Sequence, residues 1–291
     1  MNVALLGTGL LGQGVAERLH ATGHTLTVYN RSIEKTQALR QQGIRIAPTA
    51  AEAISAAGVV LLLLSDAEAI RSVLFDRVTS RAIDGRTIIQ MGTIGPTESC
   101  AIEKEITRLG ARYLEAPVLG SIAEAKAGTL LIMVGATQQH YDEWAPLLRQ
   151  LGEEVRLVGS VGKAAVMKLA LNQLIAAEMA AFAFSLGLIR RGGVNVEDFM
   201  GVVRKSALYA TMFEKKLPRL EKRNYAQPNF STRHLLKDVE LALGAAQSAH
   251  LSPAGLQGVR SLLIDTIAVG LGDVDYSAIY ERVDPPAPEE S

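Results

Sequence analysis

Two polar residues, Lys168 and Asn172, lie four positions apart in a stretch that is otherwise almost wholly apolar, VMKLALNQLIAAEMAAFAFSLGLI, residues 166–189. Residues four apart on a helix project from the same face, so we predict an ammonium and an amide side by side near the start of a long helix. An ammonium can stabilise negative charge developing on an oxygen and then donate a proton, and an amide can orient a ligand by hydrogen bonding. Burial would lower the pKa of the lysine, because desolvation disfavours its charged form. The alternative is that Lys168 extends its ammonium to solvent along its methylene chain and that Asn172 caps a neighbouring loop.

A glycine-rich loop, GTGLLG at residues 7–12, is the second feature that could do chemistry, because it matches G-x-G-x-x-G. It follows the apolar segment 2–7 and opens a helical segment at 11–21, which is the context in which this pattern indicates dinucleotide binding. The glycines let the backbone approach a pyrophosphate, and the helix N-terminus offers free N–H groups and a favourable dipole. A glycine turn without a ligand is the alternative. We expect cofactor contacts from every residue of the loop: Gly7, Thr8, Gly9, Leu10, Leu11 and Gly12.

The type of dinucleotide follows from the end of the next apolar segment, VYNRS, which places Asn30, Arg31 and Ser32 after the strand. Folds that prefer NAD usually carry Asp or Glu there, to bind the ribose 2′-hydroxyl. Without a carboxylate, a 2′-phosphate is not repelled, and Arg31 can pair with it through charge-assisted hydrogen bonds. These three residues therefore predict NADP(H) in preference to NAD(H), unless Arg31 is merely solvated.

The elements that position these residues alternate between strand-like and helical patterns in the first half of the chain. Helical segments at 11–21, 33–41 and 97–109 lie between short apolar runs, an order typical of an α/β domain with a mainly parallel sheet. The run VVLLLL lacks alternation, as expected of a strand covered on both faces. Strands are predicted at 2–7, 25–30, 44–47, 59–65, 87–92, 112–118, 130–136 and 154–159.

Strand-like runs stop after about residue 162, and the long apolar helix is followed by helical segments at 196–205, 233–249 and 255–269, with a short one near 277. We therefore predict a Rossmann-type dinucleotide-binding domain over residues 1–161 and an all-α domain over 162–283, begun by a long interdomain helix. The sequence from 284 to 291 is rich in proline and acid, so we expect a disordered tail.

Composition excludes several other classes of function. Thirty basic residues balance thirty acidic ones, and no basic patch is present, so a nucleic-acid partner is not expected. The single cysteine, Cys100, permits no intrachain disulfide, and the N-terminus lacks the pattern of a signal peptide, so we expect a cytoplasmic protein. Four polar residues interrupt the long apolar helix, which favours a buried core helix over a membrane span. The five histidines are scattered without a carboxylate or cysteine set, so no metal site is expected.

Several segments in the same order resemble the β-hydroxyacid dehydrogenase family, which includes 3-hydroxyisobutyrate dehydrogenases and glyoxylate/succinic semialdehyde reductases. These segments are LLGTGLLGQGVAERL with VYNRS, LLSD, QMGTIGP, EAPVLGSIAEAKAGTL, GKAAVMKLALNQ and RHLLKDVELAL. Within the family, VYNRS, LSDAEAIRSVLF and LGDVDYSAI are most similar to the glyoxylate/succinic semialdehyde reductase branch.

The resemblance implies roles for individual residues. Lys168 matches the catalytic lysine, which donates the proton in reduction and accepts it in oxidation, and Asn172 matches an asparagine that helps to hold the substrate. Gly120 and Ser121 match the loop that binds the substrate carboxylate. The remaining matches are cofactor positions, with Thr93 also expected near the substrate: Leu64, Ser65, Thr93, Lys237 and the accompanying Asp238.

One position departs from the family. Many members have serine where this chain has Leu119, and the serine hydroxyl contacts the acid substrate. That hydrogen bond cannot form here, so the resemblance predicts a less polar pocket at Leu119, or a longer-chain acid, with the carboxylate bound by the loop backbone and Ser121.

The sequence therefore predicts an NADPH-dependent reductase of a small aldehyde or keto acid, of the glyoxylate or succinic semialdehyde type. Two alternatives stay open: a 3-hydroxyisobutyrate or 3-hydroxybutyrate dehydrogenase that works oxidatively, and a catalytically silent dinucleotide-binding protein. An imine reductase would share the fold, but the resemblance implies that it usually lacks a lysine at position 168. Because the apolar helix 166–189 would be exposed in one small domain, we also expect a homodimer or homotetramer.

Overall fold

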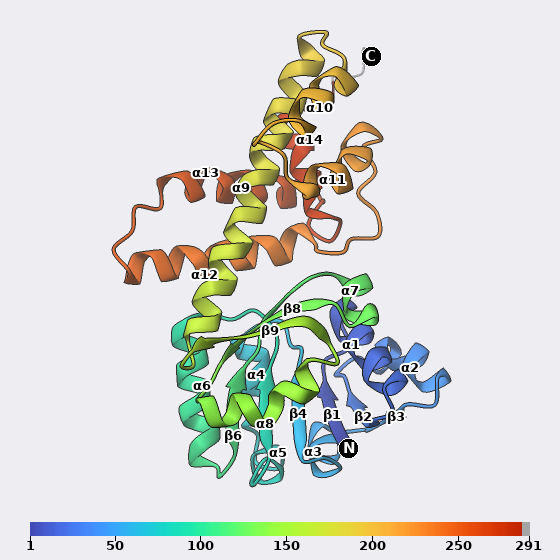
Figure 1. The fold of residues 1–291 in the computed structure, drawn as a ribbon, viewed down its shortest axis with the longest axis vertical. Coiled ribbons are helices and arrows are strands. Elements are labelled where there is room, and N and C mark those ends of the chain that lie inside the picture. The colour runs from blue at the N-terminus through green and yellow to red at the C-terminus, as the bar shows by residue number, and fades with distance from the viewer. Residues whose placement is uncertain (287–291) are drawn as a thin grey trace. The chain divides into compact units, whose positions relative to one another are not determined.

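The computed structural model describes residues 1–286, in two compact units: Met1–Leu169 and a second that begins at Ala170 (Figure 1). The first unit contains a nine-stranded sheet in the order β3-β2-β1-β4-β5-β6-β8-β7, with β9 paired to β8. The strands are β1 (Asn2–Leu6), β2 (Thr25–Tyr29), β3 (Arg45–Ile46), β4 (Val59–Leu62), β5 (Thr87–Gln90), β6 (Arg112–Glu115), β7 (Val118–Leu119), β8 (Leu130–Gly135) and β9 (Gly152–Gly159).

The first six strands in this order are parallel, and the central strands β1, β4 and β5 are buried on both faces. Alternate residues of β1 join different core clusters: Val3 and Leu5 pack in one, Ala4 and Leu6 in the other. Successive side chains of a strand point to opposite faces, so each face of the sheet has its own core. The helices of this unit are α1 (Leu10–Ala21), the 3₁₀ turn η1 (Ile33–Thr36), α2 (Gln37–Gln41), α3 (Ala50–Ser55), α4 (Ala67–Leu74), α5 (Thr79–Ala82), α6 (Pro96–Arg108), α7 (Ile122–Ala127) and α8 (Gln138–Leu148).

One predicted strand is wrong in its extent. The run 112–118 was expected to be a single strand, but β6 ends at Glu115 and β7 begins at Val118, where it pairs antiparallel with β8. Pro117 lies at the break, and proline has no N–H with which to continue a ladder. The chain therefore changes direction here, just before the loop that contains Gly120.

The second unit is helical, as the sequence predicts, and the predicted α/β domain followed by an all-α domain is confirmed. Its core contains buried side chains of α9, α10, α11, α12 and α13. The elements are α9 (Lys163–Arg191), whose first residues belong to the first unit, α10 (Val196–Arg204), α11 (Thr211–Glu221), α12 (Thr232–Ser248), α13 (Ala254–Ala268), η2 (Tyr276–Ile279) and α14 (Tyr280–Val283). By length and composition alone α9 could cross a membrane, and its polar residues Lys168 and Asn172 are buried.

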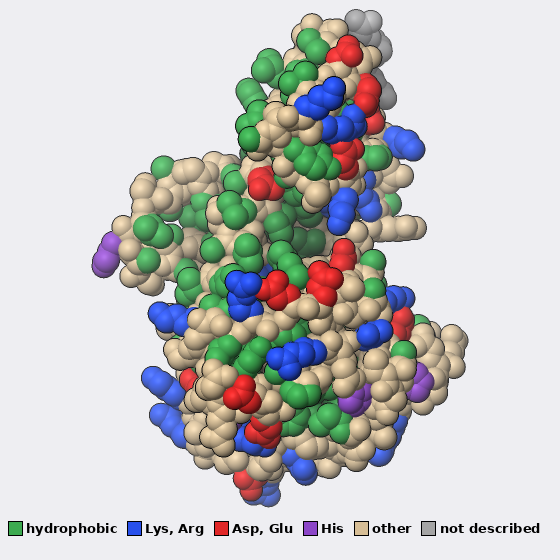
Figure 2. Space-filling model, viewed as in Figure 1, with side chains coloured by type: hydrophobic (Ala, Val, Ile, Leu, Met, Phe, Trp, Pro, Cys, Tyr) green, Lys and Arg blue, Asp and Glu red, His purple; other side chains and the backbone are tan. Residues whose placement is uncertain are grey.

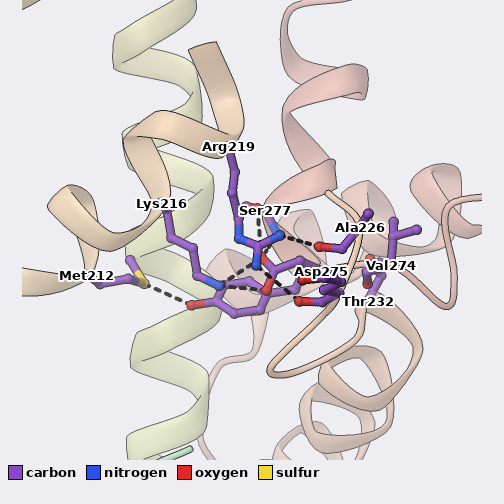
Figure 3. Close-up of polar contacts among 10 residues, drawn as sticks. Met212, Lys216, Arg219, Ala226, Thr232, Val274, Asp275 and Ser277 are labelled. Atoms are coloured by element: carbon purple, nitrogen blue, oxygen red, sulfur yellow. Dashed lines mark hydrogen bonds and ion pairs between the residues drawn. The ribbon is translucent and has the colours of Figure 1, made fainter. Parts of the chain in front are cut away.

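A buried ion pair joins two parts of the second unit (Figure 3). Both carboxylate oxygens of Asp275 lie 2.7 Å from the Lys216 ammonium, which also lies 4.2 Å from the centre of the Tyr276 ring. The Ser277 hydroxyl and backbone N–H donate to the same carboxylate at 2.7 and 3.1 Å. Lys216 therefore fixes α11 to the segment that leads into η2.

The first residue of the predicted tail is held by the fold. Asp284 was assigned to it, but this residue is buried, and its carboxylate accepts hydrogen bonds from Arg191 Nε at 2.6 Å and from the Tyr280 hydroxyl at 2.8 Å. A buried carboxylate with two donors, one of them the cationic Arg191, is held in place, whatever the composition of the chain around it. The last five positions of the predicted tail, 287–291, lie outside the described residues.

Candidate active site

Three loops meet at the carboxyl ends of β1, β4 and β5, and glycines let their backbones pack closely. A Cβ on Gly7, whose φ is +102°, would lie 2.4 Å from the Leu63 carbonyl oxygen. A Cβ on Gly92 would lie 2.5 Å from the carbonyl oxygen of Leu64. The glycine loop and the two following loops thus form one surface at the edge of the sheet, which is where open α/β sheets bind ligands.

The glycine loop fits a dinucleotide. A Cβ on Gly12 would lie 2.1 Å from the Gly7 carbonyl oxygen, so the turn itself requires this glycine. A Cβ on Gly9 would meet no described atom within 4 Å, so the folded chain does not require glycine there. Gly9 is also the N-cap of α1, where no side chain caps the helix. The N-terminal N–H groups of α1 and the open space at Gly9 suit the close approach of a pyrophosphate.

Asn30 holds the glycine loop in place. Its Oδ1 accepts from the Thr8 N–H at 2.9 Å, and its Nδ2 donates to the Ser32 carbonyl at 2.8 Å. Both ends of this amide are therefore used within the protein, so the structure shows Asn30 as a support of the glycine loop. Arg31, between Asn30 and Ser32, is exposed at the end of β2.

The predicted residues of the next two loops lie at this surface. Leu64 follows β4, and the Ser65 hydroxyl donates to Asp66 Oδ2 at 2.7 Å. Asp66 in turn caps α4 by accepting from the Ala69 N–H at 2.7 Å. Thr93 lies in the loop after β5, where it lines a pocket that also contains Lys168.

Lys168 is 9% exposed, so the expectation that this lysine is buried is confirmed. It lies in the first turns of α9 and lines a narrow pocket at the sheet edge. The other lining residues come from the loop after β5, the end of β6 and the start of α9: Gln90, Gly92, Thr93, Ile94, Glu115, Pro117 and Ala165. Such a pocket places one ammonium beside a carboxylate, an amide and a hydroxyl, with apolar side chains between them.

Asn172, Asp238 and Lys237 form a second group, within the second unit. Asn172 is 3% exposed, and its Nδ2 donates to Asp238 Oδ2 at 2.6 Å. The Lys237 ammonium lies 2.8 Å from the other oxygen, Asp238 Oδ1. Because an ionised carboxylate only accepts, the Asn172 amide must turn its nitrogen toward Asp238. Its Oδ1 is buried and accepts no hydrogen bond from the described part of the chain.

The predicted substrate loop follows the short strand β7. Leu119 is half-buried and pairs with Leu131 of β8. Gly120 has a φ of +135°, a conformation that side chains disfavour, and a Cβ there would also lie 2.7 Å from Leu130 Cδ2. The Ser121 N–H donates to Glu124 Oε2 at 2.9 Å, and its hydroxyl donates to the same oxygen. Both donors that the sequence assigned to a substrate carboxylate are thus engaged in capping α7.

Comparison with known proteins agrees with this geometry. Residues 2–159 match the family model described as the NAD-binding domain of 6-phosphogluconate dehydrogenase. Residues 162–283 match the model described as NAD-binding of NADP-dependent 3-hydroxyisobutyrate dehydrogenase. Glyoxylate/succinic semialdehyde reductase 1 of Arabidopsis thaliana is 31% identical over 285 residues, which cover 97% of this chain and 98% of that protein. The chain belongs to the β-hydroxyacid dehydrogenase family. It is an NAD(P)-dependent oxidoreductase of that type.

Solved structures of β-hydroxyacid dehydrogenases and related proteins share the fold. The 3-hydroxyisobutyrate dehydrogenase of Salmonella typhimurium superposes with a TM-score of 0.88 at 22% identity, over 97% of this chain and 99% of its own. A structure described as Psf3 in complex with NADP⁺ and 2-OPP gives the same TM-score, identity and coverage.

One acidic residue in the pocket that contains Lys168, Glu115, was not predicted from the sequence. Glu115, at the end of β6, is 2% exposed and accepts hydrogen bonds from α6 and from the start of α9. The signal available in the sequence was a carboxylate directly before the predicted substrate loop, in EAPVLGS. Nothing local distinguishes such a residue from an exposed one at the end of a strand.

Proposed function

We propose that this β-hydroxyacid dehydrogenase reduces a small aldehyde or keto acid with NADPH, and that Lys168 delivers the proton. The observation that carries the proposal is the burial of Lys168 in a pocket beside Thr93 and Pro117, at the edge of the sheet where the glycine loop also lies. The Arabidopsis relative, named as a glyoxylate/succinic semialdehyde reductase, supports the class of substrate.

The proposed reaction needs one hydride and one proton. The reduced nicotinamide supplies the hydride to the carbonyl carbon when the cofactor is bound. The Lys168 ammonium stabilises the negative charge that develops on the carbonyl oxygen and donates its proton there, which yields the alcohol and a neutral amine. The burial of Lys168 strengthens this interaction, because a charge is screened less where water is excluded. In the oxidative direction, which stays an alternative, the neutral amine would accept the same proton.

Preference for NADPH is part of the proposal and is supported by the end of β2. No carboxylate stands there to repel a 2′-phosphate, and the exposed Arg31 guanidinium can pair with it. Replacement Arg31→Asp should raise the Kd of NADPH by at least about 10-fold more than that of NADH. Arg40→Asp, at an exposed arginine of α2, is the matched control and should leave the ratio unchanged. Equal losses for both cofactors in Arg31→Asp would refute the assignment.

Lys168→Ala tests the catalytic role. Turnover should fall on the order of 100-fold or more, while the Kd of NADPH changes little, because the lysine acts on the substrate and not on the cofactor. Lys163→Ala removes an exposed lysine from the same helix and should retain turnover. Substantial residual turnover in Lys168→Ala would count against the proposal.

The substrate is to be found with a panel of aldehyde and keto acids of two to five carbons, and of the matching hydroxy acids with NADP⁺. Leu119 presents an apolar side chain where many relatives carry a hydroxyl, so we expect the four-carbon semialdehyde to give a higher kcat/KM than the two-carbon glyoxylate. Turnover of none of these compounds would favour a silent dinucleotide-binding protein.

We further infer that a second copy of the chain covers one face of α9. Leu174, Phe184 and Leu188 are 49%, 63% and 62% exposed, and with the exposed Ala181 they recur at helical spacing along one stripe. Figure 2 shows hydrophobic side chains exposed over the second unit. A contiguous apolar stripe of this kind, unlike single exposed apolar side chains, is typical of an interaction surface.

Light scattering after gel filtration tests this interface. The wild-type mass should be a multiple of 31.1 kDa. Phe184→Glu should lower the mass toward one chain, and Val202→Glu, at an exposed valine of α10 outside the stripe, should not. A wild-type protein that runs as one chain would contradict the inference.

A further inference from the structure

The buried carboxylate of Glu115 binds the beginning of α9. Its Oε1 accepts from the N–H groups of Ala164 and Ala165, at 2.8 and 3.3 Å. The first N–H groups of a helix have no partner within the helix, and a negative charge there is also favoured by the helix dipole. Glu115 therefore caps α9 from another part of the chain.

The capped turn is the one that leads to Lys168. Ala164 and Ala165 precede Lys168 by four and three residues, so all three lie on one side of the helix. Ala165, Lys168 and Glu115 also line the same narrow pocket. A displacement of the first turn would therefore move the base of the lysine side chain.

The other side of the carboxylate is held just as closely. Glu115 Oε2 accepts from the Ser99 hydroxyl of α6 at 2.6 Å, and Ser99 Oγ lies 2.9 Å from the Tyr113 hydroxyl. Opposite Glu115 in the sheet stands Gly135, where a Cβ would lie 2.2 Å from Glu115 Oε1. The fold thus leaves space for this carboxylate and surrounds it with hydrogen-bond donors. A residue that only filled space at this position would not need these donors.

We propose that Glu115 is a positioning residue of the reaction, which anchors the first turn of α9, and with it Lys168, and supplies the negative charge of the pocket in which Lys168 titrates. The proposal rests on the catalytic role proposed for Lys168. It adds a residue that acts through the lysine.

Two titratable neighbours of Glu115, Tyr113 and Cys100, carry no charge of their own. Burial raises the pKa of the Tyr113 hydroxyl and, with the charge of Glu115, that of the Cys100 thiol, so both stay neutral over the working pH range. Burial also raises the pKa of Glu115 itself, and above that pKa the carboxylate is charged. A nearby negative charge favours the protonated amine. Among the titratable and charged groups near this carboxylate are Tyr113 of β6, Cys100, Glu103 and Lys104 of α6, and Lys168 of α9.

Two substitutions at Glu115 separate anchoring from charge. Glu115→Gln keeps the shape and removes the charge, so the alkaline limb of the kcat/KM profile should move to lower pH by about one unit. Glu115→Asp keeps the charge but withdraws it from the helix, so the limb should stay while kcat falls roughly 10-fold. The KM for NADPH should change less than about twofold in both variants, since the glycine loop is untouched. Glu103→Gln, at a half-buried carboxylate of α6 outside the pocket, is the matched control and should keep the wild-type profile.

Two measurements do not depend on turnover. Hydrogen exchange at Ala164 and Ala165 should quicken in Glu115→Asp, because the shorter side chain withdraws the acceptor from their N–H groups, and should change less in Glu115→Gln, which keeps an amide oxygen there. The rate at which an acylating reagent modifies Lys168, followed by mass spectrometry against pH, should shift in Glu115→Gln only. If the wild type turned over none of the acids while both shifts appeared, the proposed function would fall and the positioning role would stand. Wild-type exchange in Glu115→Asp together with a wild-type Lys168 titration in Glu115→Gln would overturn the positioning role, whatever the activity.

Discussion

The buried pair Lys216–Asp275 offers the sharpest test of how the second unit is stabilised. Lys216→Met removes the ammonium and keeps an apolar chain of similar length. Asp275 then retains only the Ser277 N–H and hydroxyl as donors, in a position with no exposure to solvent. Asp275→Asn is the reciprocal change, which keeps an acceptor for Ser277 and leaves the ammonium with the Tyr276 ring.

The expected loss follows from the burial of both partners. Lys216 is 7% exposed and Asp275 is 0% exposed, and removal of one member of such a pair costs about 3–5 kcal/mol, because the other charge is left buried. The double variant Lys216→Met with Asp275→Asn contains no charge and leaves only one amide group unsatisfied, which costs about 1–3 kcal/mol. The two single losses should therefore exceed the loss in the double variant by at least about 3 kcal/mol.

The chain contains probes that distinguish the two units. Its one tryptophan, Trp144, is in α8 of the first unit, whereas the second unit is helical. Urea unfolding followed by circular dichroism at the helix band reports both units, and tryptophan fluorescence reports the first alone. Lys216→Met should shift the circular dichroism transition, and should shift the fluorescence transition less or not at all.

Either of two results would refute this reasoning. A loss below about 1 kcal/mol in each single variant would mean that water reaches the pair and screens it, as at an exposed ion pair. Additive losses in the double variant would mean that the two side chains stabilise the unit separately and that the 2.7 Å contact contributes nothing of its own.

Three further predictions concern the first unit. Gly9→Ala should leave the unfolding free energy unchanged and raise the Kd of NADPH at least about 10-fold. Gly12→Ala should lower the unfolding free energy by about 1–3 kcal/mol, because a Cβ at position 12, unlike one at position 9, meets the backbone. Equal unfolding free energies of the two variants would contradict this. Glu124→Gln should lower the KM of an acid substrate roughly threefold, since a carboxylate no longer competes for the Ser121 donors, and a higher KM would exclude Ser121 as a carboxylate ligand. Because the pKa of Glu115 is raised above its ordinary 4.5, the folded state keeps a proton that the unfolded chain has lost at pH values between the two pKa values. The unfolding free energy of the wild type, relative to that of Glu115→Gln, should therefore fall as pH rises from 4.5 to the raised pKa. Urea titrations from pH 4.5 upward, followed by Trp144 fluorescence, measure this difference, and a constant difference would disprove the prediction.

The features that could be predicted from sequence are those fixed by nearby residues. The turn at Gly7 and Gly12 depends on contacts within the loop and with one adjacent strand, so the motif and its context suffice to predict it. The shared face of Lys168 and Asn172 follows from helix periodicity alone. Unbroken apolar runs such as VVLLLL indicate buried parallel strands for the same local reason.

The features that could not be predicted depend on partners far away in the chain. The donors to Glu115 Oε1 lie 49 and 50 residues further on, and Lys216 and Asp275 are 59 residues apart. Helix α11 was not predicted at all, since FEKKLPRLEK contains six charged residues and a proline, and resembles an exposed segment. Lys216 of α11 can be buried because it pairs with Asp275, and no local sequence pattern connects these two residues.

The role of Ser121 is an intermediate case, because its signal was present and was overlooked. Ser121 and Glu124 stand in the order S-x-x-E, which predicts a capping box at the start of a helix. The structure forms that box, and both donors of Ser121 point to Glu124. An acid substrate would therefore have to displace a carboxylate that is already in the chain.

The amide of Asn172 limits what the second unit can offer a ligand. Asp238 takes the amide nitrogen, which leaves Oδ1 as the only free polar atom of this side chain. An oxygen of this kind accepts from a hydroxyl or an ammonium and cannot donate to a carboxylate. The acid group of a substrate must then be bound by other donors. The Asn172 oxygen is suited to accept from the hydroxyl of a hydroxy acid or from a protonated amine. Asp238→Asn would remove the constraint, because two amides can pair in either orientation, and the discrimination between hydroxy acid and keto acid should weaken with it.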